Sequence, residues 1–233
     1  LIHKANFVAC HNPSYVNKYN MVQELVDGGT FLLNCAWDME GLEKHLPGQV
    51  KAFIANHNIK FYTIDGVKIG IETGMGPTRI NTILQSAFFK LANVMPIDDA
   101  VEFMKAAAKK SYGKKGDAVV EMNYKAIDAG VDAVHKVEVP ASWSNPEADP
   151  TPKELTGRPE TVKMVRDLME PISKMDGDSL PVSAFAKNPD GQFEHGAAAY
   201  EKRGTAVMVP EWDPASCVPV SYTHLTLPTN SLV

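Results

Sequence analysis

Short apolar runs alternate with amphipathic segments along the first 92 residues of the chain. Three runs rich in apolar, β-branched or aromatic residues predict buried strands at residues 5–10, 30–34 and 60–65. Around them, apolar residues recur at helical spacing and predict helices at residues 15–26, 39–55, 66–72 and 78–92. Strands that alternate with helices over short connections predict an α/β fold: a doubly wound, mostly parallel sheet with helices on both faces.

Glycine and proline indicate where several of these helices end. Ser14 is expected to cap the start of the first helix. Gly28-Gly29 is expected to end it, because glycine adopts the left-handed conformation at a helix C-terminus at little cost. Pro47-Gly48 is expected to interrupt the second helix, and a Gly-Met-Gly-Pro loop at 74–77 precedes the helix at 78–92.

The pattern changes after residue 97. Residues 97–139 are expected to be purely helical, with two core-facing apolar stripes, the first of them closed by Gly113. Residues 140–158 are rich in Pro, Glu and Asp, and Trp143 is their single large anchor, which predicts a linker or an arm along the surface. A short helix is expected at 161–173, followed by loop-like and strand-like chain up to residue 213.

Composition and charge narrow the class of protein. The chain has 233 residues, 44% of them hydrophobic, as in ordinary soluble domains. Its net charge of -5 argues against nucleic acid or an anionic membrane as the main partner, because both bind basic surfaces. No apolar run approaches the roughly 20 residues of a membrane span. Three widely spaced cysteines, Cys10, Cys35 and Cys217, argue against a disulfide scaffold and favour a reducing cytoplasm.

Two places in the predicted sheet offer candidate chemistry. Ligands of open α/β sheets bind beyond the carboxyl ends of the strands, which selects His11-Asn12, Asn34 to Trp37, and Asp65 with Lys68. Helix capping by Asn and Asp explains these residues about equally well. The loop Gly74-Met75-Gly76, followed by Arg79 and Asn81 at a helix N-terminus, is a second candidate, for an anionic group. The alternative there is a plain loop with a surface arginine.

Longer runs in a fixed order carry a family resemblance. They are His-Asn-Pro-Ser-Tyr-Val at 11–16, Gly-Gly-Thr-Phe-Leu-Leu-Asn at 28–34, Lys-Phe-Tyr-Thr-Ile-Asp at 60–65, Arg-Ile-Asn at 79–81, Gln-Ser-Ala-Phe-Phe-Lys-Leu at 85–91 and Ser-Tyr-Gly-Lys-Lys-Gly at 111–116. This series closely resembles the gamma-type domain of pyruvate:ferredoxin (flavodoxin) oxidoreductases. Leu-Pro-Val-Ser-Ala-Phe at 180–185 and Tyr-Glu-Lys-Arg-Gly at 200–204 resemble that family's small Glu-Lys-Arg connecting module. The resemblance covers about residues 1–219.

The resemblance implies a fragment of a larger, homodimeric enzyme. That enzyme decarboxylates pyruvate oxidatively on thiamine diphosphate with Mg²⁺. It passes electrons through [4Fe-4S] clusters to ferredoxin or flavodoxin, and it yields acetyl-CoA. The thiamine-binding and pyruvate-binding domains lie elsewhere in that polypeptide, so no catalytic residue is expected in this chain. The family's gamma-type domain begins with a Gly-rich strand and loop upstream, so the sheet is expected to be incomplete at its N-terminal side.

The implied domain boundaries follow the same comparison. Residues 1–139 correspond to the gamma-type domain, and residues 140–180 to an arm and a helix that complete it. Residues 181–216 correspond to the connecting module, which is expected to be a small irregular or β appendage. Residues 217–233 correspond to the start of a ferredoxin-like domain.

The gamma-type domain of the family helps to bind coenzyme A, which suggests a site in this chain. Gly28, Gly29 and Thr30 are expected to let the backbone approach the ligand, and Asn34, Arg79 and Asn81 to be its polar partners. The alternative is a purely structural or docking module without ligand contact. A free-standing nucleotide-dependent dehydrogenase is disfavoured, because the dinucleotide fingerprint G-x-G-x-x-G is missing.

Cys217 stands where the family's first [4Fe-4S] ligand is expected. The family continues as C-x-x-C-x-x-C-x-x-x-C-P, but Val220 occupies the second cysteine's place here and no further cysteine follows. Cys217 is therefore expected to be a lone, exposed thiol, and residues 220–233 a truncated or misread tail. The alternative is a genuine variant without a cluster.

Overall fold

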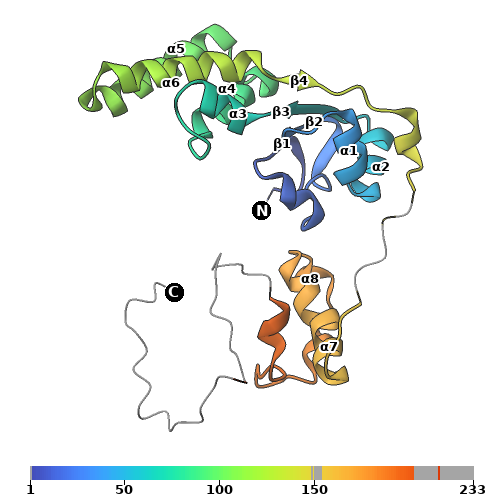
Figure 1. Ribbon diagram of the computed structural model, residues 1–233. Helices are drawn as coiled ribbons and strands as arrows, with labels where there is room; N and C mark the ends of the chain where they lie inside the picture. The colour runs from blue at the N-terminus through green and yellow to red at the C-terminus, as the bar shows by residue number, and fades with distance from the viewer. Residues whose placement is uncertain (1, 148, 150–153, 202–214, 216–233) are drawn as a thin grey trace, which may run out of the picture. The chain divides into compact units, whose positions relative to one another are not determined.

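The computed structural model describes residues 2–147, 149, 154–201 and 215, which fall into two compact units (Figure 1). Unit 1 comprises Leu1–Glu154 and unit 2 comprises Leu155–Val233. The division therefore lies between the two boundaries expected at residues 139 and 180. In the described residues, no helix is long and apolar enough to cross a membrane.

Unit 1 is built on a four-stranded sheet in the order β1-β2-β3-β4. Its strands are β1 (Ala5–Cys10), β2 (Leu25–Asn34), β3 (Lys60–Ile64) and β4 (His135–Lys136). The first three strands are mutually parallel, and β4 pairs antiparallel with β3. The predicted α/β class with a mostly parallel sheet is confirmed, and β1 is an outer strand of this sheet.

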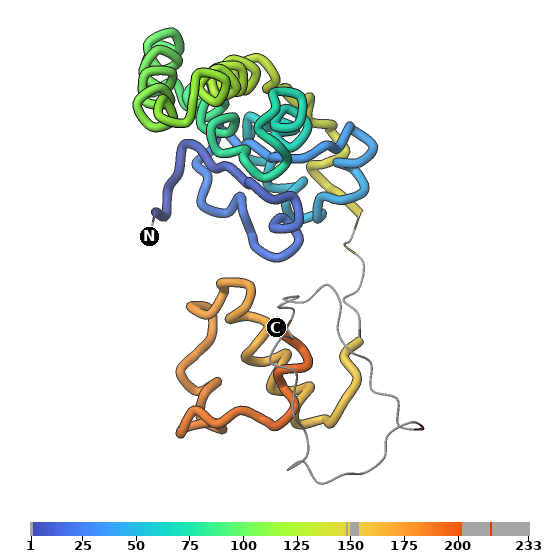
Figure 2. Tube along the Cα trace, turned by 60° about the vertical axis from the view of Figure 1, so that its left-hand side comes forward, coloured from blue at the N-terminus to red at the C-terminus, as the bar shows by residue number. Residues whose placement is uncertain are grey.

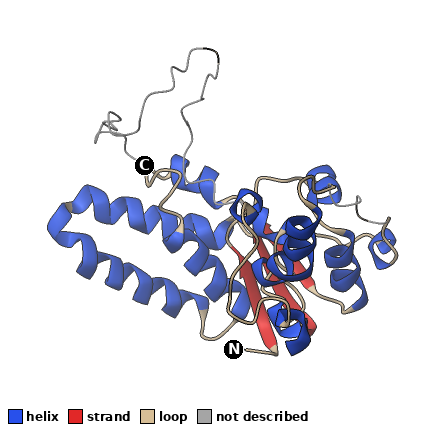
Figure 3. Cartoon of the chain, turned by 90° about the horizontal axis from the view of Figure 1, so that it is seen from below, coloured by secondary structure: helices blue, strands red, loops and turns tan. Residues whose placement is uncertain are grey.

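Side chains of the sheet alternate between two apolar cores, and helices lie on both sides of the strands (Figure 3). Phe31 and Leu33 of β2 pack in one core with Val50 and Ile54 of α2 (Gly48–Asn56). Leu32, between them, packs in the other core with residues of α4 (Asn81–Ala92) and α6 (Asp117–Asp132). Burial on both faces explains why the strands read as continuous apolar runs.

The helix expected at 15–26 is wrong. Residues Pro13–Asn17 form one 3-10 turn, capped by the Asn12 side chain rather than by Ser14, and β2 already begins at Leu25. Gly28 therefore lies inside a strand, at φ +72°, and its N–H donates to the His57 carbonyl over 2.8 Å. Its positive φ accompanies an irregular register between β1 and β2, so these glycines bend a strand instead of ending a helix.

The remaining helices of unit 1 follow the predictions closely. Pro47-Gly48 does separate α1 (Met39–His45) from α2, and β3 leads into α3 (Gly66–Glu72). The last long helices, α5 (Ile97–Tyr112) and α6, form a hairpin joined by a 3-10 turn at Gly113–Lys115 (Figure 2). Met104 and Ala108 of α5 and Ile127 of α6 share a small core.

The purely helical stretch expected up to residue 139 ends earlier, at Asp132. His135–Lys136 forms β4, and the Val137 N–H then donates to the Phe61 carbonyl over 2.9 Å. Val137 and Val139 both pack against the first core. Apolar residues at a spacing of two, here 137 and 139, suit an extended chain at a sheet edge better than a helix.

The predicted arm is anchored by Trp143, which lies in the 3-10 turn Ala141–Ser144 and is fully buried in the first core. Its indole N–H donates to the Glu43 carboxylate, whose other oxygen lies 3.1 Å from the Lys51 ammonium. These contacts, the indole first, lower the pKa of Glu43. Farther along the arm, Asp149 accepts a 2.6 Å hydrogen bond from the Gly48 N–H.

Unit 2 contains the helix predicted at 161–173, in three consecutive segments. They are α7 (Pro159–Met164), a π-helical turn at Val165–Met169 and α8 (Glu170–Ser173). Short 3-10 turns follow at Gly177–Ser179, Val182–Phe185 and Ala197–Tyr200, and no strand occurs among residues 154–201. The appendage expected here as irregular or β structure therefore consists of helical turns in its described part. The Tyr200 hydroxyl in the last of these turns donates a hydrogen bond to the Thr156 carbonyl near the start of unit 2.

Candidate functional site

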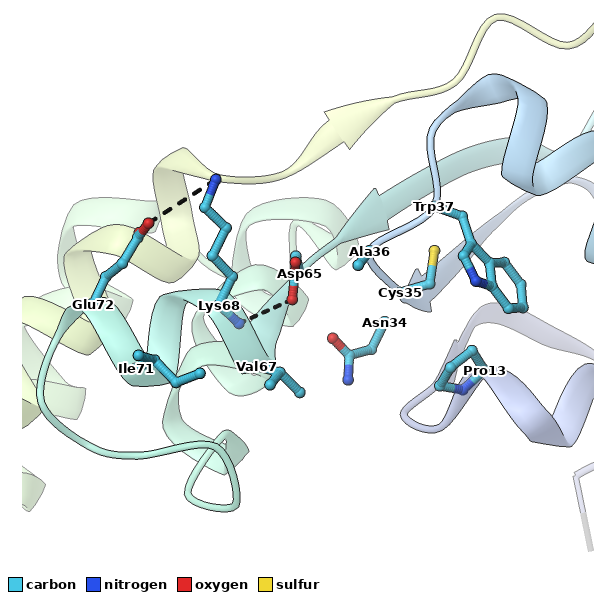
Figure 4. Close-up of a pocket in the computed structure, with 10 residues that line it drawn as sticks. All are labelled: Pro13, Asn34, Cys35, Ala36, Trp37, Asp65, Val67, Lys68, Ile71 and Glu72. Carbon is cyan, nitrogen blue, oxygen red and sulfur yellow. Dashed lines mark hydrogen bonds and ion pairs between the residues drawn. The ribbon is translucent and has the colours of Figure 1, made fainter.

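A pocket of about 600 Å³ opens beyond the carboxyl ends of β2 and β3 (Figure 4). Its walls come from three places: the turn after β1, the segment after β2, and the last residue before α3 with α3 itself. They contribute Pro13, Asn34, Cys35, Ala36, Trp37, Asp65, Val67, Lys68, Ile71 and Glu72. This is the edge of the sheet that the strand-end rule selects.

Asn34, the last residue of β2, holds the base of this pocket together. Its Nδ2 donates to the His11 carbonyl after β1, and its Oδ1 accepts from the Gly66 N–H that begins α3, both over 2.8 Å. A Cβ on Gly66 would lie 3.0 Å from that Oδ1, so glycine permits the close approach. Asn34 is 5% exposed, and its amide is engaged at both ends within the protein.

Asp65 shapes the same edge by capping α3. Its Oδ1 accepts from the Lys68 N–H over 2.9 Å, which satisfies a backbone donor at the start of the helix. The Lys68 ammonium lies 4.0 Å from the Glu72 carboxylate, and both side chains are exposed. Asp65 therefore both caps α3 and lines the pocket.

The pocket's thiol is not an activated nucleophile. Cys35 is buried, and burial raises its pKa above the ordinary value, with a further contribution from the charge of Asp65. Burial likewise raises the pKa of Cys10 to about 11. Both thiols are free and neutral near pH 7, whereas nucleophilic attack requires a thiolate.

The lining favours an uncharged ligand segment with a few polar groups. Pro13, Trp37, Val67 and Ile71 present apolar surface, and Lys68 is the one cation in the lining, beside two carboxylates. A pocket that is mostly apolar with sparse polar groups is typical of a small-molecule site.

The structure separates the residues expected to form one site. Asn34 lines the pocket, but Gly28, Gly29 and Thr30 lie in the middle of β2, away from its carboxyl end. Thr30 pairs with Lys60, the first residue of β3, roughly 13 Å from Asn34 at the ordinary rise per residue. A Cβ on Gly29 would lie 2.8 Å from the Val26 carbonyl oxygen, so close backbone packing accounts for this glycine.

Arg79 and Asn81 also lie outside the pocket lining. Both are exposed at the start of α4, where no side chain caps the helix. Ile80, between them, packs near Gly66, since a Cβ there would be 3.6 Å from it. The two polar residues thus flank the side of the site where α3 begins.

Four residues of the pocket lining had escaped the sequence reasoning: Pro13, Val67, Ile71 and Glu72. Val67 and Ile71 are four residues apart on α3 and remain 41% and 59% exposed. An apolar pair at this spacing on a predicted helix next to a strand end was the available signal.

Metal chemistry finds no support in the described residues, which contain no group of three or more His, Cys, Asp or Glu side chains arranged for a metal ion. Cys217 and the tail at 220–233 lie outside the described residues, so the expectations about them stay predictions.

Two family models match the chain. The model described as pyruvate ferredoxin/flavodoxin oxidoreductase matches residues 1–133, which include strands β1 to β3, all residues that line the pocket, and α6. The chain belongs to this family. A second model, EKR, described as a domain of unknown function, matches residues 148–206, which cover the described part of unit 2.

Curated relatives agree with this assignment. The chain is 44% identical over 228 residues to pyruvate:ferredoxin oxidoreductase of Moorella thermoacetica, and 45% identical over 217 residues to pyruvate-flavodoxin oxidoreductase of Klebsiella pneumoniae. The alignments cover 98% and 93% of the chain but 19% and 18% of the relatives, so it spans about a fifth of their length. Among solved structures, the PORC subunit of pyruvate oxidoreductase from Thermotoga maritima matches 59% of this chain and 67% of its own, with 18% identity and a TM-score of 0.47.

Proposed function

We propose that this chain is the coenzyme A-binding part of a pyruvate:ferredoxin/flavodoxin oxidoreductase, and that the strand-end pocket takes the pantetheine arm of CoA. The observation that carries the proposal is the pocket of about 600 Å³ beyond β2 and β3. In this proposal the whole protein carries out the oxidative decarboxylation of pyruvate with CoA to acetyl-CoA, with electrons passed to ferredoxin or flavodoxin, and membership of the family supports it.

The two ends of CoA make different demands on the protein. Its pantetheine arm is a chain of methylenes and amides without charge, which suits the apolar walls formed by Trp37, Val67 and Ile71. Its phosphates are anions, and the pocket lining holds two carboxylates against one lysine. We therefore propose that the phosphates lie outside the pocket, near Arg79 and Asn81 at the start of α4, where backbone N–H groups favour anions.

The role of the chain in the reaction is to position a substrate. Holding the thiol of CoA at a fixed place replaces a bimolecular encounter by an oriented one. Thiamine diphosphate with Mg²⁺, the [4Fe-4S] clusters and the pyruvate site belong to the rest of the larger, homodimeric protein in this proposal. The cytoplasm, a reducing compartment, suits an enzyme with free thiols.

Blocking the pocket in the full-length protein tests the proposal. Val67→Trp places a large ring in the pocket from a half-exposed position, and we expect the KM for CoA to rise about tenfold or more, a loss of roughly 1.4 kcal/mol. The KM for pyruvate should not change. Val94→Trp, an exposed position outside the pocket lining, is the matched control and should leave both values unchanged.

The alternative is a structural or docking module without ligand contact. In that case Val67→Trp leaves the KM for CoA unchanged, which would contradict the proposal. Arg79→Ala tests the path of the phosphates separately, and we expect a smaller rise in the KM for CoA with an unchanged KM for pyruvate.

A further inference from the structure

The α5–α6 hairpin ends in a cluster of exposed lysines. Lys109, Lys110, Lys114 and Lys115, the tip lysines, fall within seven residues, and no acidic residue occurs between Glu102 and Asp117. The hairpin extends away from the sheet and carries these lysines at its far end (Figures 1 and 3). This concentration of positive charge stands out in a chain whose net charge is -5.

The tip lysines are not neutralised within the described part of the chain. None of their ammonium groups makes an ion pair or hydrogen bond there, and Lys115 alone has a ring contact, 5.5 Å from the Tyr112 centroid. By contrast, Lys105, one turn earlier on α5, forms a 2.7 Å ion pair with Asp128. Asp117 and Glu121, the carboxylates on the first turns of α6, make no ion pair with the tip lysines.

Such a cluster carries a local energetic cost. Like charges within one or two helical turns repel each other. The dipole at the C-terminus of α5 offsets part of this repulsion for Lys109 and Lys110, but Lys114 and Lys115 lie beyond the helix. An external anionic partner would remove this cost by supplying the missing counter-charge.

An apolar stripe on the outer face of α5 leads up to the tip lysines. Phe103, Ala107 and Lys110 are spaced four and three residues apart, so they lie on one face, and Phe103 is 64% exposed. Met104 and Ala108, which face the core, are buried. An exposed aromatic ring beside cations on a projecting helix end suits a macromolecular surface, since aromatic residues are enriched in protein interfaces. The strand-end pocket contains no tip lysine.

We propose that the tip lysines and Phe103 form a docking surface for the acidic face of a small electron-carrier protein, an acidic ferredoxin. The choice of partner rests on the proposed oxidoreductase function, because relatives are named for ferredoxin and flavodoxin. Charge complementarity steers such encounters and accelerates association, and electron-transfer complexes are small and short-lived.

Charge reversal in the full-length protein tests this surface. Lys114→Glu/Lys115→Glu should lower kcat/KM for an acidic ferredoxin by about tenfold at low ionic strength, and the difference from wild type should shrink as salt screens the charges. The reduction of methyl viologen, a small acceptor that needs no docking surface, should proceed at the wild-type rate. The matched control is Lys4→Glu/Lys18→Glu, which makes the same change of charge at two exposed lysines elsewhere in unit 1.

Three outcomes would overturn the proposal. One is an unchanged kcat/KM for ferredoxin in the tip variant. Another is an equal loss of viologen reduction, which would place the lysines within the enzyme's own assembly or reaction. The third is an equal loss in the control variant, which would indicate a general effect of charge. Failure of the CoA proposal has a separate signature, an unchanged KM for CoA in Val67→Trp, so the two tests are independent.

Discussion

Asn34 shows how one side chain can hold together the edge of a pocket that it also lines. Its amide joins the turn after β1 to the first residue of α3, across the end of β2. Both hydrogen bonds satisfy backbone groups, and they leave one N–H of Nδ2 without a partner among these contacts. Asn34 is therefore a positioning residue, and the pocket depends on it through geometry.

Replacing Asn34 by leucine should be costly. Asn34→Leu leaves the His11 carbonyl and the Gly66 N–H without their partner, and we expect the free energy of unfolding of unit 1 to fall by about 2–4 kcal/mol. Asn12→Leu, which removes the exposed cap of the 3-10 turn, is the matched control and should cost about 1 kcal/mol. Urea unfolding of both variants measures the difference, and equal losses would contradict the assigned role.

At the level of single residues, the sequence located the pocket edge but not its ligand contacts. The strand-end rule selected Asn34 to Trp37 and Asp65 with Lys68, all of which line the pocket, and also His11-Asn12, which do not. The sequence did not predict that the Asn34 amide bonds to two backbone groups, because these bonds depend on how the turn after β1 and the start of α3 meet in space. Gly28 and Asn34 both lie on β2, but Gly28 is in the middle of the strand and does not line the pocket, whereas Asn34 is its last residue and does.

Among the elements, the arm around Trp143 is the clearest case of long-range anchoring. Trp143 is separated by 100 residues from Glu43, to which its indole N–H donates. The buried ring fixes the chain after β4 against α2, and Lys51 lies 5.9 Å from the ring centroid. A proline-rich composition predicted an arm, and the single large apolar residue in it predicted the anchor.

The pH dependence of stability tests this anchor. A carboxyl whose pKa is lowered in the folded state stabilises the fold above its ordinary pKa of 4.5, and loses that contribution as the pH falls through the folded value. Trp143→Phe keeps an aromatic ring but removes the N–H that contributes most to the shift. The free energy of unfolding of the variant should therefore decline less steeply below pH 4.5 than that of the wild type.

Urea unfolding across this acidic range, followed in wild type and Trp143→Phe, measures the effect. Trp37→Phe serves as the control, because Trp37 stacks on His45 and is not bonded to Glu43. Parallel pH profiles for wild type and Trp143→Phe would show that the indole does not set the pKa of Glu43.

Local periodicity predicted long elements well and irregular ones poorly. Both helices of the α5–α6 hairpin followed from apolar spacing over 16 residues each. The prediction of a helix at 15–26 failed because the apolar residues Val22 and Leu25 are buried without being helical. Val22 lies in the segment that leads into β2, and Leu25 is the first residue of that strand. Strand β4 was missed since two residues carry little periodicity, and its place depends on pairing with β3, far away in sequence.

For the whole molecule, each of the two units corresponds largely to one of the two family models. Strands β1 to β3, the pocket and the tip lysines all belong to unit 1 and lie within the residues matched by the oxidoreductase model. Unit 2 corresponds to the EKR model and contains a small core around Met164, Val165 and Leu168. The order of motifs along the chain was enough to identify the family, whereas the boundary at Glu154 depended on packing.

The central claim is that CoA occupies the strand-end pocket. Amide hydrogen exchange of the full-length protein, with and without CoA, tests it most directly. We predict slower exchange with CoA in residues 35–37 and 66–72, which line or adjoin the pocket, and no change in residues 109–116 at the hairpin tip. Protection by CoA confined to other parts of the protein, with unchanged exchange at 35–37 and 66–72, would contradict the claim.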